Sequence, residues 1–397
     1  MDTQQIKELA AKYIMNTYGI RDIALVRGQG VKVWDAEGQE YLDFVGGIAV
    51  NLLGHCHPTV VEAINQQAQT LIHVSNLYCI EPQVKLAELL CRISFAEKCF
   101  FCNSGAEANE AAIKLARKYA KLNIAPDKYE IITMLNSFHG RTLAAITATG
   151  QPKYQHGFEP LVPGFVYATF NDLASVKEKI NQHTCAIMVE PIQGESGVHP
   201  STPEFLSGLR QLCTEHNLLL IYDEVQCGLG RVGKMFGYEL YGIPPDIMTL
   251  SKGLGGGVPI GATLATDKIA AAFSPGNHAS TFGGNPLASA AAIAALQTIL
   301  DQKLAENATK QGAYFYQQLL DLKKKYDFIT DVRGKGLLLG LQLDREGKPF
   351  VVKCAEKGLL INCAAEKVLR FLPPLIINQQ HIDEAISILD QVFAEVK

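Results

Sequence analysis

Two charged residues follow strongly apolar segments of the chain. Lys252 comes shortly after the apolar residues 247–250, and Asp223 comes directly after residues 218–222. Ligands of parallel sheets bind at the carboxyl ends of the strands, which is where these two side chains would lie. A lysine whose pKa is lowered by burial or by a neighbouring cation forms Schiff bases with carbonyl compounds. An ionised aspartate can partner a protonated ring nitrogen. Each residue also has an ordinary alternative, since most lysines are surface charges and an aspartate can cap a helix or bind a metal.

A phosphate site is predicted at the turn Asn103-Ser-Gly-Ala-Glu107, which follows an apolar segment and begins a long helix. Free backbone N–H groups at a helix start, together with the helix dipole, bind phosphate. Ser104 can equally cap this helix, with Glu107 completing a capping box, and the two roles are compatible. Phe138 could stack on a bound ring or simply pack in the core. The lysine, the aspartate and the helix start together favour pyridoxal phosphate.

Four other motifs suggest different chemistry, but in each case the neighbouring sequence argues against the function that the motif suggests. Gly228-Leu-Gly-Arg-Val-Gly233 matches the dinucleotide fingerprint, but Asp223-Glu-Val-Gln-Cys separates it from the preceding strand. Residues 218–224 resemble the acidic strand of nucleotide hydrolases, but the chain has no Gly-Lys-Ser/Thr loop. Cys99-Phe-Phe-Cys102 lies in a predicted strand, where positions three apart face opposite ways. His55-Cys-His57 reads as a strand-to-helix turn, so no metal site is expected.

The composition bounds the class of protein. The 397 residues exceed the size at which one core stops growing, so two domains are expected. Hydrophobic residues make up 48%, and 36 basic residues face 40 acidic ones, which excludes a disordered chain and gives no general attraction to nucleic acid. No apolar run reaches the ~20 residues of a membrane span. The first residues lack a secretory signal pattern, and the ten cysteines are too sparse for a disulfide scaffold. We therefore expect a cytoplasmic protein.

Helices and apolar strands alternate along most of the chain. Apolar runs separated by helices are typical of a mainly parallel sheet that is covered on both faces. Expected strands lie at residues 31–34, 41–44, 98–102, 131–135, 186–189, 218–222, 247–250, 260–265, 328–333 and 336–343. Expected helices lie at 6–18, 58–71, 82–93 and 106–122, in an Ala-rich segment after Pro286, in a longer one to about 326, and from 380 onwards. The expected class is α/β: residues 51–285 form a large domain, 286–397 a small α+β domain, and 1–50 pack beside the latter.

Six sequence blocks resemble the signatures of the class III aminotransferases, in that family's order. They are Asn103-Ser-Gly-Ala-Glu-Ala-Asn109, Phe138-His-Gly-Arg-Thr142, Glu190-Pro-Ile-Gln-Gly-Glu195, Asp223-Glu-Val-Gln226, Ser251-Lys-Gly253 and Ser280-Thr-Phe-Gly-Gly-Asn-Pro286. The similarity runs from about residue 18 to 370. It implies the aspartate aminotransferase-like fold type I, pyridoxal 5'-phosphate as cofactor, and a homodimer with the active site at the subunit interface. Gly150-Gln-Pro-Lys-Tyr154, Gly157-Phe-Glu-Pro160 and His139 resemble the branch of the family that acts on N2-acetylornithine.

The resemblance assigns cofactor roles residue by residue. Lys252 would bind the cofactor covalently and then act as the general acid and base, and Asp223 would pair with the ring nitrogen. Phe138 and Val225 would contact the two ring faces, and Gln226 would bond the ring hydroxyl. The phosphate would be held at the turn of Ser104, Gly105 and Ala106 and, from the other subunit, by Thr281.

Substrate roles are implied for a second set. Arg141, helped by Tyr18, would take the distal carboxylate, and Arg370 would take the α-carboxylate of glutamate or 2-oxoglutarate, because planar arginines suit carboxylates. Glu195 would pair with Arg370 while the amine donor is bound, and Ser280 would lie near the substrate. As ordinary alternatives, arginines are often surface charges, and Glu195 also fits the pattern of an ordinary loop acid.

The implied reaction moves the ω-amino group of N2-acetylornithine to 2-oxoglutarate. Succinylated diaminopimelate or ornithine, free ornithine and 4-aminobutyrate stay open as donors, because pocket shape decides such selectivity. An aminomutase on the same scaffold and a nicotinamide-dependent oxidoreductase are the rival functions. Two departures from the family pattern occur: Ser196 stands where glycine is usual, and Ile20-Arg21-Asp22 displaces an arginine by one position.

Overall fold

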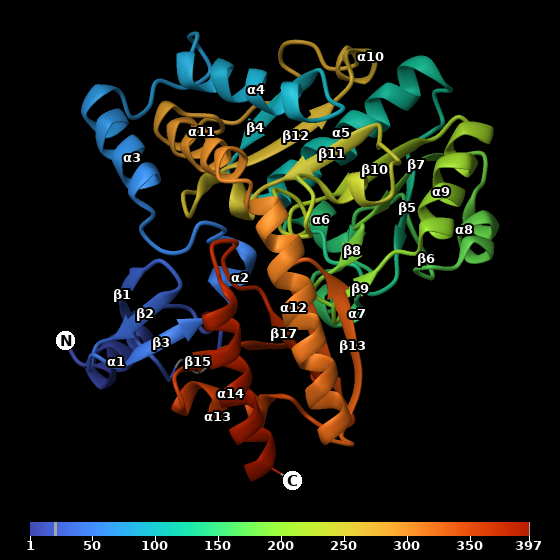
Figure 1. The fold of residues 1–397 in the computed structure, drawn as a ribbon. Coiled ribbons are helices and arrows are strands. Elements are labelled where there is room, and N and C mark those ends of the chain that lie inside the picture. Colours follow the sequence, from blue (N-terminus) through green and yellow to red (C-terminus); the bar gives the residue numbers. More distant parts are fainter. Residues whose placement is uncertain (20–21, 397) are drawn as a thin grey trace.

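The computed structural model describes residues 1–19 and 22–396, and Figure 1 shows two lobes joined by a long helix, α12. The larger lobe is built on a seven-stranded sheet. Its strands, in spatial order, are β4 (Lys98–Cys102), β12 (Gly261–Ala265), β11 (Ile247–Leu250), β10 (Leu219–Asp223), β7 (Thr184–Val189), β5 (Glu130–Met134) and β6 (Phe165–Ala168).

The sheet is mainly parallel, as expected, with one exception. Strand β12 runs antiparallel to both of its neighbours, β11 and β4. The remaining neighbours, from β11 to β6, pair in parallel. The sequence could not reveal this reversal, because a fully buried apolar strand looks the same in either direction.

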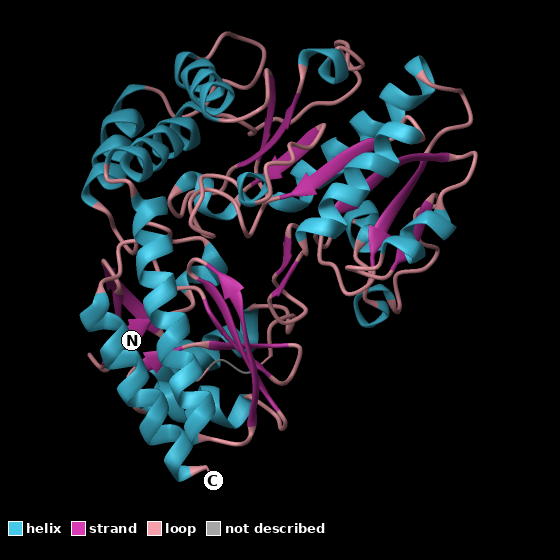
Figure 2. Cartoon of the chain, turned by 45° about the vertical axis from the view of Figure 1, so that its right-hand side comes forward, coloured by secondary structure: helices cyan, strands magenta, loops and turns pink. Residues whose placement is uncertain are grey.

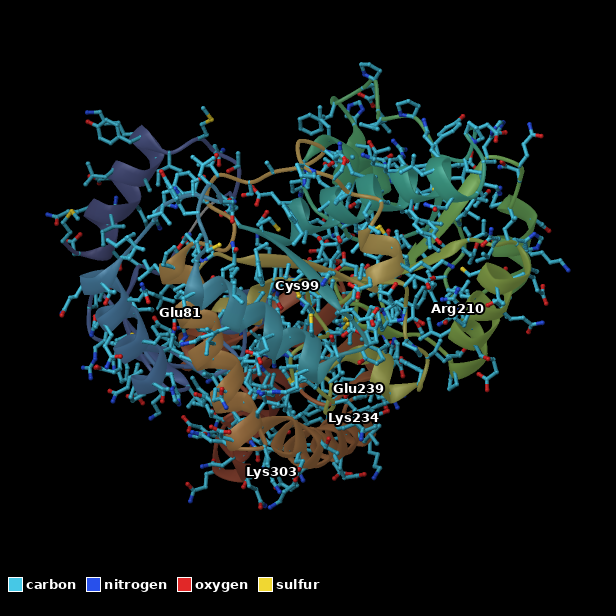
Figure 3. The ribbon with its side chains drawn as sticks, turned by 90° about the horizontal axis from the view of Figure 1, so that it is seen from above. Glu81, Cys99, Arg210, Lys234, Glu239 and Lys303 are labelled. Carbon is cyan, nitrogen blue, oxygen red and sulfur yellow. The ribbon has the colours of Figure 1, made fainter. Side chains whose placement is uncertain are left out.

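Helices cover both faces of this sheet. Successive residues of a strand point to opposite faces, so Ile131 and Ile221 pack with α5 (Gly105–Asn123), while Ile132 and Leu220 pack with α9 (Pro203–Glu215). Arg210 of α9, labelled in Figure 3, pairs with Asp246 at 2.8 Å and so ties this helix to the segment before β11. The other helical segments of this lobe are α3 (Pro58–Thr70), α4 (Glu81–Ile93), α6 (Leu143–Ala148), α7 (Pro152–Gln155), α8 (Leu173–Lys179), α10 (Asp267–Ala270) and the 3-10 turns η1 (Gly237–Leu240) and η2 (Lys252–Gly255).

The strand ends collect the chemistry at one edge of the sheet. Asp223 ends β10 and lies in register with Thr249 of β11, three residues before Lys252. Strand β4 ends at Cys102, which pairs with Gly261 at the start of β12, so the turn at Ser104 reaches the same edge. A short hairpin, β8 (Ile192–Gln193) with β9 (His199–Pro200), continues from β7.

The smaller lobe combines both ends of the chain (Figure 2). Strands β1 (Leu25–Gln29), β2 (Lys32–Asp35) and β3 (Glu40–Asp43) form a sheet with β15 (Leu359–Leu360), so early and late segments share hydrogen bonds. A second sheet has the order β13 (Ile329–Lys335), β14 (Leu338–Leu343), β17 (Val368–Phe371) and β16 (Asn362–Ala364). Its helices are α1 (Thr3–Tyr13), α12 (Leu304–Lys325), α13 (Lys348–Glu356) and α14 (Gln379–Glu395), and α2 (Gly46–Ala49) lies between the lobes. Helix α11 (Pro286–Asp301), which was expected in the small domain, instead packs against α3 and α4 of the larger lobe (Figure 1).

Most expected elements are present within a few residues of their predicted bounds. Strand β6 was not expected, and the first helix ends at Tyr13 instead of near residue 18. The exact domain boundaries stay a prediction. Over the described ranges, none of the helices has the length and apolar character that crossing a bilayer requires.

Candidate active site

A cavity of about 250 Å³ opens at the carboxyl edge of the large sheet. Most of the residues predicted to bind a cofactor line it. Its lining consists of Gly105, Ala106, Asn109, Phe138, His139, Gly140, Arg141, Glu190, Asp223, Val225, Gln226, Ser251 and Lys252.

Lys252 enters this cavity from the turn that follows β11. Its φ of 39° lies in the left-handed region that non-glycine residues seldom adopt, a strain that is typical of functional positions. Burial lowers the pKa of Lys252; Glu195 opposes the shift and Arg370 adds to it. A lowered pKa increases the share of neutral amine, which is the form that attacks a carbonyl carbon.

Asp223 is 4% exposed and accepts three hydrogen bonds from its own chain. Its Oδ2 accepts from Asn109 Nδ2 at 2.7 Å and from His139 Nδ1 at 2.8 Å, and its Oδ1 accepts from the Val225 N–H at 3.0 Å. Thr249 in turn donates to Asn109 Oδ1 at 2.7 Å, which fixes the amide orientation. These donors fix the direction of the carboxylate.

His139 completes this arrangement from the opposite side. Burial lowers its pKa, but the hydrogen bond and the charge of Asp223 outweigh burial, so the net shift is upward. Its Nε2 is buried and has no hydrogen-bond partner among the residues that the structure describes. The imidazole therefore acts here as a support for Asp223.

The start of α5 provides the predicted anion site. Ser104 caps the helix, its Oγ accepting from the Glu107 N–H at 3.2 Å. The expected capping box does not close on Ser104, because the Glu107 carboxylate instead accepts from Asn103 Nδ2 at 2.9 Å and from the Asn103 N–H. A Cβ on Gly105 would lie 2.8 Å from Val225 Cγ1, so only glycine allows the helix start to pack this closely against the Val225 side chain. The first N–H groups of a helix have no partner within it and can bind a phosphate.

Two buried glutamates support the cavity. Glu190 accepts from the Phe138 N–H at 3.0 Å, and burial raises its pKa to about 7. Glu224 accepts from the N–H groups of Gly237 and Tyr238, and burial raises its pKa to about 8. Asn109, Glu190 and Glu224 were not predicted as functional residues, although all three lie inside the recognised sequence blocks.

Behind Gln226 of the cavity lining, Glu195 and Arg370 form an ion pair. Arg370 is 1% exposed, and its Nη1 donates to Glu195 Oε1 at 2.8 Å, to Gln226 Oε1 at 3.2 Å and to the Gly194 carbonyl at 3.0 Å. Burial raises the pKa of Glu195, but the charges of Arg370 and Lys252 outweigh it and hold the pKa below its ordinary value. The structure thus brings together the two residues that were predicted to pair.

The remaining predicted site residues are Arg141, which lines the cavity, and Ser280, Thr281 and Tyr18, which do not. Arg141 is exposed, with its guanidinium carbon 4.0 Å from the centre of the Tyr154 ring. Ser280 Oγ accepts from Asn103 Nδ2 at 3.3 Å, which attaches it to the phosphate-site turn. Thr281 is exposed and Tyr18 is 79% exposed, and neither lines the cavity. Residues 20 and 21, where the departure at Ile20 and Arg21 falls, lie outside the described residues.

The cysteine motif has a structural explanation. Cys99, labelled in Figure 3, lies on β4 with its Sγ 3.8 Å from Cys91 Sγ of α4, whereas the Cys102 thiol donates to the Ser104 carbonyl at 3.5 Å. The two motif cysteines therefore have different partners. His55 Nε2 hydrogen-bonds Asp43 at 2.7 Å, and within the described ranges no three His, Cys, Asp or Glu side chains are grouped to hold a metal ion.

The glycine-rich segment 228–233 joins the two lobes. Arg231 is fully buried, and its Nη1 donates to the carbonyl oxygens of Leu337, at 3.0 Å, and Pro373 in the smaller lobe. Gly233 has a φ of 91°, and a Cβ there would lie 2.5 Å from Thr309 Oγ1. Packing between the lobes thus accounts for the glycine spacing that resembled a dinucleotide fingerprint.

Fold and cavity together define an enzyme that uses pyridoxal phosphate: a lysine and an aspartate at adjacent strand ends face a helix start suited to phosphate. The family model of aminotransferase class III matches residues 14–393. The chain belongs to this family.

Relatives and solved structures agree with this assignment. The chain is 56% identical to an acetylornithine aminotransferase of Caldanaerobacter subterraneus, over 97% of this chain and 98% of the relative. It is 53% identical to an acetylornithine aminotransferase of Methanocaldococcus jannaschii, with 98% of both chains covered. The crystal structure of an ornithine aminotransferase from Toxoplasma gondii superposes with a TM-score of 0.96 at 34% identity, covering 100% of this chain and 96% of that one.

Proposed function

We propose that this enzyme transfers the ω-amino group of N2-acetylornithine to 2-oxoglutarate, giving N-acetylglutamate 5-semialdehyde and glutamate in arginine biosynthesis. The relatives named acetylornithine aminotransferase are 53% and 56% identical over nearly the whole chain. The similar ornithine aminotransferase structure is 34% identical. The observation that carries the proposal is a pair of arginines: Arg141 is exposed and lines the cavity that holds Lys252, and Arg370 is buried against Glu195 and donates to Gln226 of the cavity lining.

The residues of the cavity fit the cofactor. Asp223, fixed by three donors, would hold the ring nitrogen, and the start of α5 at Gly105 and Ala106 would hold the phosphate. Phe138 and Val225 line the same cavity and would contact the ring, and Gln226 would reach its hydroxyl. When bound, pyridoxal phosphate supplies a carbonyl carbon that exchanges with amines and a ring that accepts electrons.

Lys252 has two tasks in this proposal. Its Nζ would hold the cofactor covalently before the substrate amine arrives. Once displaced, the neutral amine would take a proton from the substrate carbon that bears the amino group. It would then return this proton to the carbon that the cofactor supplies. The lowered pKa of Lys252 favours this second task because the amine must be unprotonated to act as a base.

Glu195 and Arg370 would let one site accept two kinds of substrate. With N2-acetylornithine bound, Glu195 neutralises Arg370, and Arg141 binds the distant carboxylate. With 2-oxoglutarate bound, Arg370 leaves Glu195 and takes the α-carboxylate, because a guanidinium binds a carboxylate through two parallel hydrogen bonds. The 2.8 Å contact between Glu195 and Arg370 corresponds to the first of these states.

A homodimer is part of the proposal. Phe282, next to Thr281, is 58% exposed, and Ile72, Leu77 and Tyr78 are 54%, 81% and 69% exposed. Phe282 contacts His73, and Asn76 Nδ2 donates to the Ser280 carbonyl at 3.0 Å, so these segments adjoin. Exposed apolar groups of this kind mark a protein interface. We expect sedimentation equilibrium to give twice the mass of one chain; a monomer at all concentrations would exclude a shared site. The cytoplasmic location stays a prediction.

Two measurements test the function: the visible absorption spectrum with each substrate, and the steady-state rate of amino-group transfer. The purified enzyme, loaded with pyridoxal phosphate, should show a visible band that bleaches on adding N2-acetylornithine and returns with 2-oxoglutarate. Lys252→Ala should lower kcat by at least about 10⁴-fold, while Lys234→Ala, at an exposed lysine (Figure 3), should leave it unchanged.

Other outcomes separate the alternatives. A protein that takes up no cofactor would overturn the assignment of the site. A band that responds to ornithine, 4-aminobutyrate or the succinylated amines, and not to N2-acetylornithine, would change the donor. Turnover without any keto acid would indicate an aminomutase.

A further inference from the structure

A tyrosine ring lies against Arg141 at the mouth of the cavity. The Arg141 guanidinium carbon is 4.0 Å from the centre of the Tyr154 ring and 5.6 Å from that of Phe138. A guanidinium within about 6 Å of an aromatic face is attracted by the ring quadrupole. Over the described residues, Arg141 has no carboxylate partner within ion-pair distance, so these rings are the contacts that orient it.

The segment that carries Tyr154 is fixed by side-chain amides. Helix α7 spans Pro152–Gln155, too short to be stable alone. At its start, Gln151 Nε2 donates to the Ser137 carbonyl at 2.8 Å; at its end, Gln155 Nε2 donates to the Thr149 carbonyl at 2.8 Å and to Tyr167 Oη at 3.0 Å. The Tyr154 backbone is therefore attached to the turn that carries Phe138 and to the end of α6.

The Tyr154 ring also has a defined orientation. It meets Phe138 edge to face, with ring centres 5.8 Å apart and planes at 82°. Lys153 Nζ lies 4.9 Å from the same ring but is exposed. Because an arginine side chain loses considerable rotamer freedom when it binds a ligand, a ring that already restricts the guanidinium lowers that cost.

We propose that Tyr154 is a positioning residue that holds Arg141 ready for the distal carboxylate of the substrate. The inference rests on the proposed role of Arg141. Tyr154 acts through Arg141, so it sets the affinity for carboxylate-bearing substrates and leaves the chemical step at Lys252 unaltered. The ring and not the hydroxyl does this, so phenylalanine at this position is sufficient.

The test uses the enzyme loaded with pyridoxal phosphate and three variants. Tyr154→Leu removes the ring, Tyr154→Phe keeps it, and Lys153→Met removes the other cation next to it. Glutarate, an unreactive dicarboxylate, is titrated by calorimetry, and KM and kcat for N2-acetylornithine and the Kd of pyridoxal phosphate are measured. We expect Tyr154→Leu to raise the glutarate Kd and KM about tenfold with kcat and cofactor Kd within about twofold. Tyr154→Phe and Lys153→Met should match the wild type.

Several results would overturn the proposal. An unchanged KM and glutarate Kd in Tyr154→Leu would show that the ring does not position Arg141. A weaker cofactor Kd with unchanged glutarate binding would show that Tyr154 acts through Phe138. If Tyr154→Leu does not fold, Tyr154→Met is measured against the same criteria. A wild-type enzyme that binds the cofactor but transfers no amino group would instead refute the proposed function, which distinguishes the two failures.

Discussion

The floor and the mouth of the cavity are built differently. At the floor, Asp223 is 4% exposed and receives three hydrogen bonds from its own chain. By the mouth we mean the two arginines proposed to bind substrate carboxylates. Arg141 is exposed and rests on an aromatic ring, and Arg370 is buried and paired with the Glu195 carboxylate. The floor is complete before a ligand arrives, while the proposed reaction requires the charges at the mouth to change partners.

This difference follows from what each end must do. The ring and the phosphate of the cofactor would keep one place through both half-reactions, so fixed dipoles and charges around them need no reorganisation. The two substrates differ by a carboxylate, so the mouth needs a charge that can be covered and uncovered. Changes at the floor should therefore affect both half-reactions equally, and changes at the mouth should affect them unequally.

The largest effect is expected for Asp223→Asn. A neutral amide cannot keep the ring nitrogen protonated, and His139 and Asn109 would lose their anionic acceptor. We expect kcat to fall about 10³-fold in both half-reactions, measured by stopped-flow absorbance with each substrate alone. A loss confined to one substrate would contradict the uniform role of the floor.

Glu224, the residue after Asp223, should make the free energy of unfolding depend on pH, and Glu224→Gln should remove this dependence. Burial raises the pKa of Glu224 from 4.5 to about 8, so the folded state holds a proton that the unfolded state releases. Stability contributed in this way falls as pH rises from about 4.5 to about 8. Between pH 5 and 7.5 the wild type should lose about 3 kcal/mol of its free energy of unfolding through this group, and Glu224→Gln should not. Urea unfolding at each pH measures the difference. The exposed Glu356→Gln should follow the wild type; an equal slope in all three would exclude Glu224 as the cause.

Arg370→Lys should separate the two half-reactions. Lysine cannot offer two parallel hydrogen bonds to a carboxylate. We expect kcat/KM for 2-oxoglutarate to fall about 30-fold, and that for N2-acetylornithine to change less than about threefold, since Glu195 covers this position with the donor bound. Single-turnover kinetics with each substrate measures both. Equal losses would mean that the mouth behaves like the floor.

The smallest effect is expected for Ser196→Gly, which restores the usual family residue. The Ser196 hydroxyl donates to Gln193 Oε1 at 3.2 Å and not to Glu195 or Arg370. Losing one partly exposed hydrogen bond should change kcat/KM for either substrate less than about threefold. A change above tenfold in steady-state assays would show that Ser196 affects the ion pair.

The sequence by itself determined the positions of most elements and most of the predicted cofactor residues that line the cavity. Three kinds of local feature can be recognised without the fold. They are the short apolar runs typical of strands, turns such as Ser104-Gly105, and charged residues directly after the runs. Lys252, Asp223 and the start of α5 lie at one edge because the carboxyl ends of parallel strands meet there. The pairing of Glu195 with Arg370 followed from the family resemblance.

Tertiary structure alone decided the rest. The reversal of β12, the support of Asp223 by Asn109 and His139, and the contact between Arg141 and Tyr154 join residues that are far apart or ordinary in sequence. Glu224 lies inside a recognised block, but only the folded structure shows that it is buried and that burial raises its pKa. Periodicity reports which face of an element is apolar, whereas direction, hydrogen-bond partners and desolvation depend on which elements pack together, and that information exists only in the folded chain.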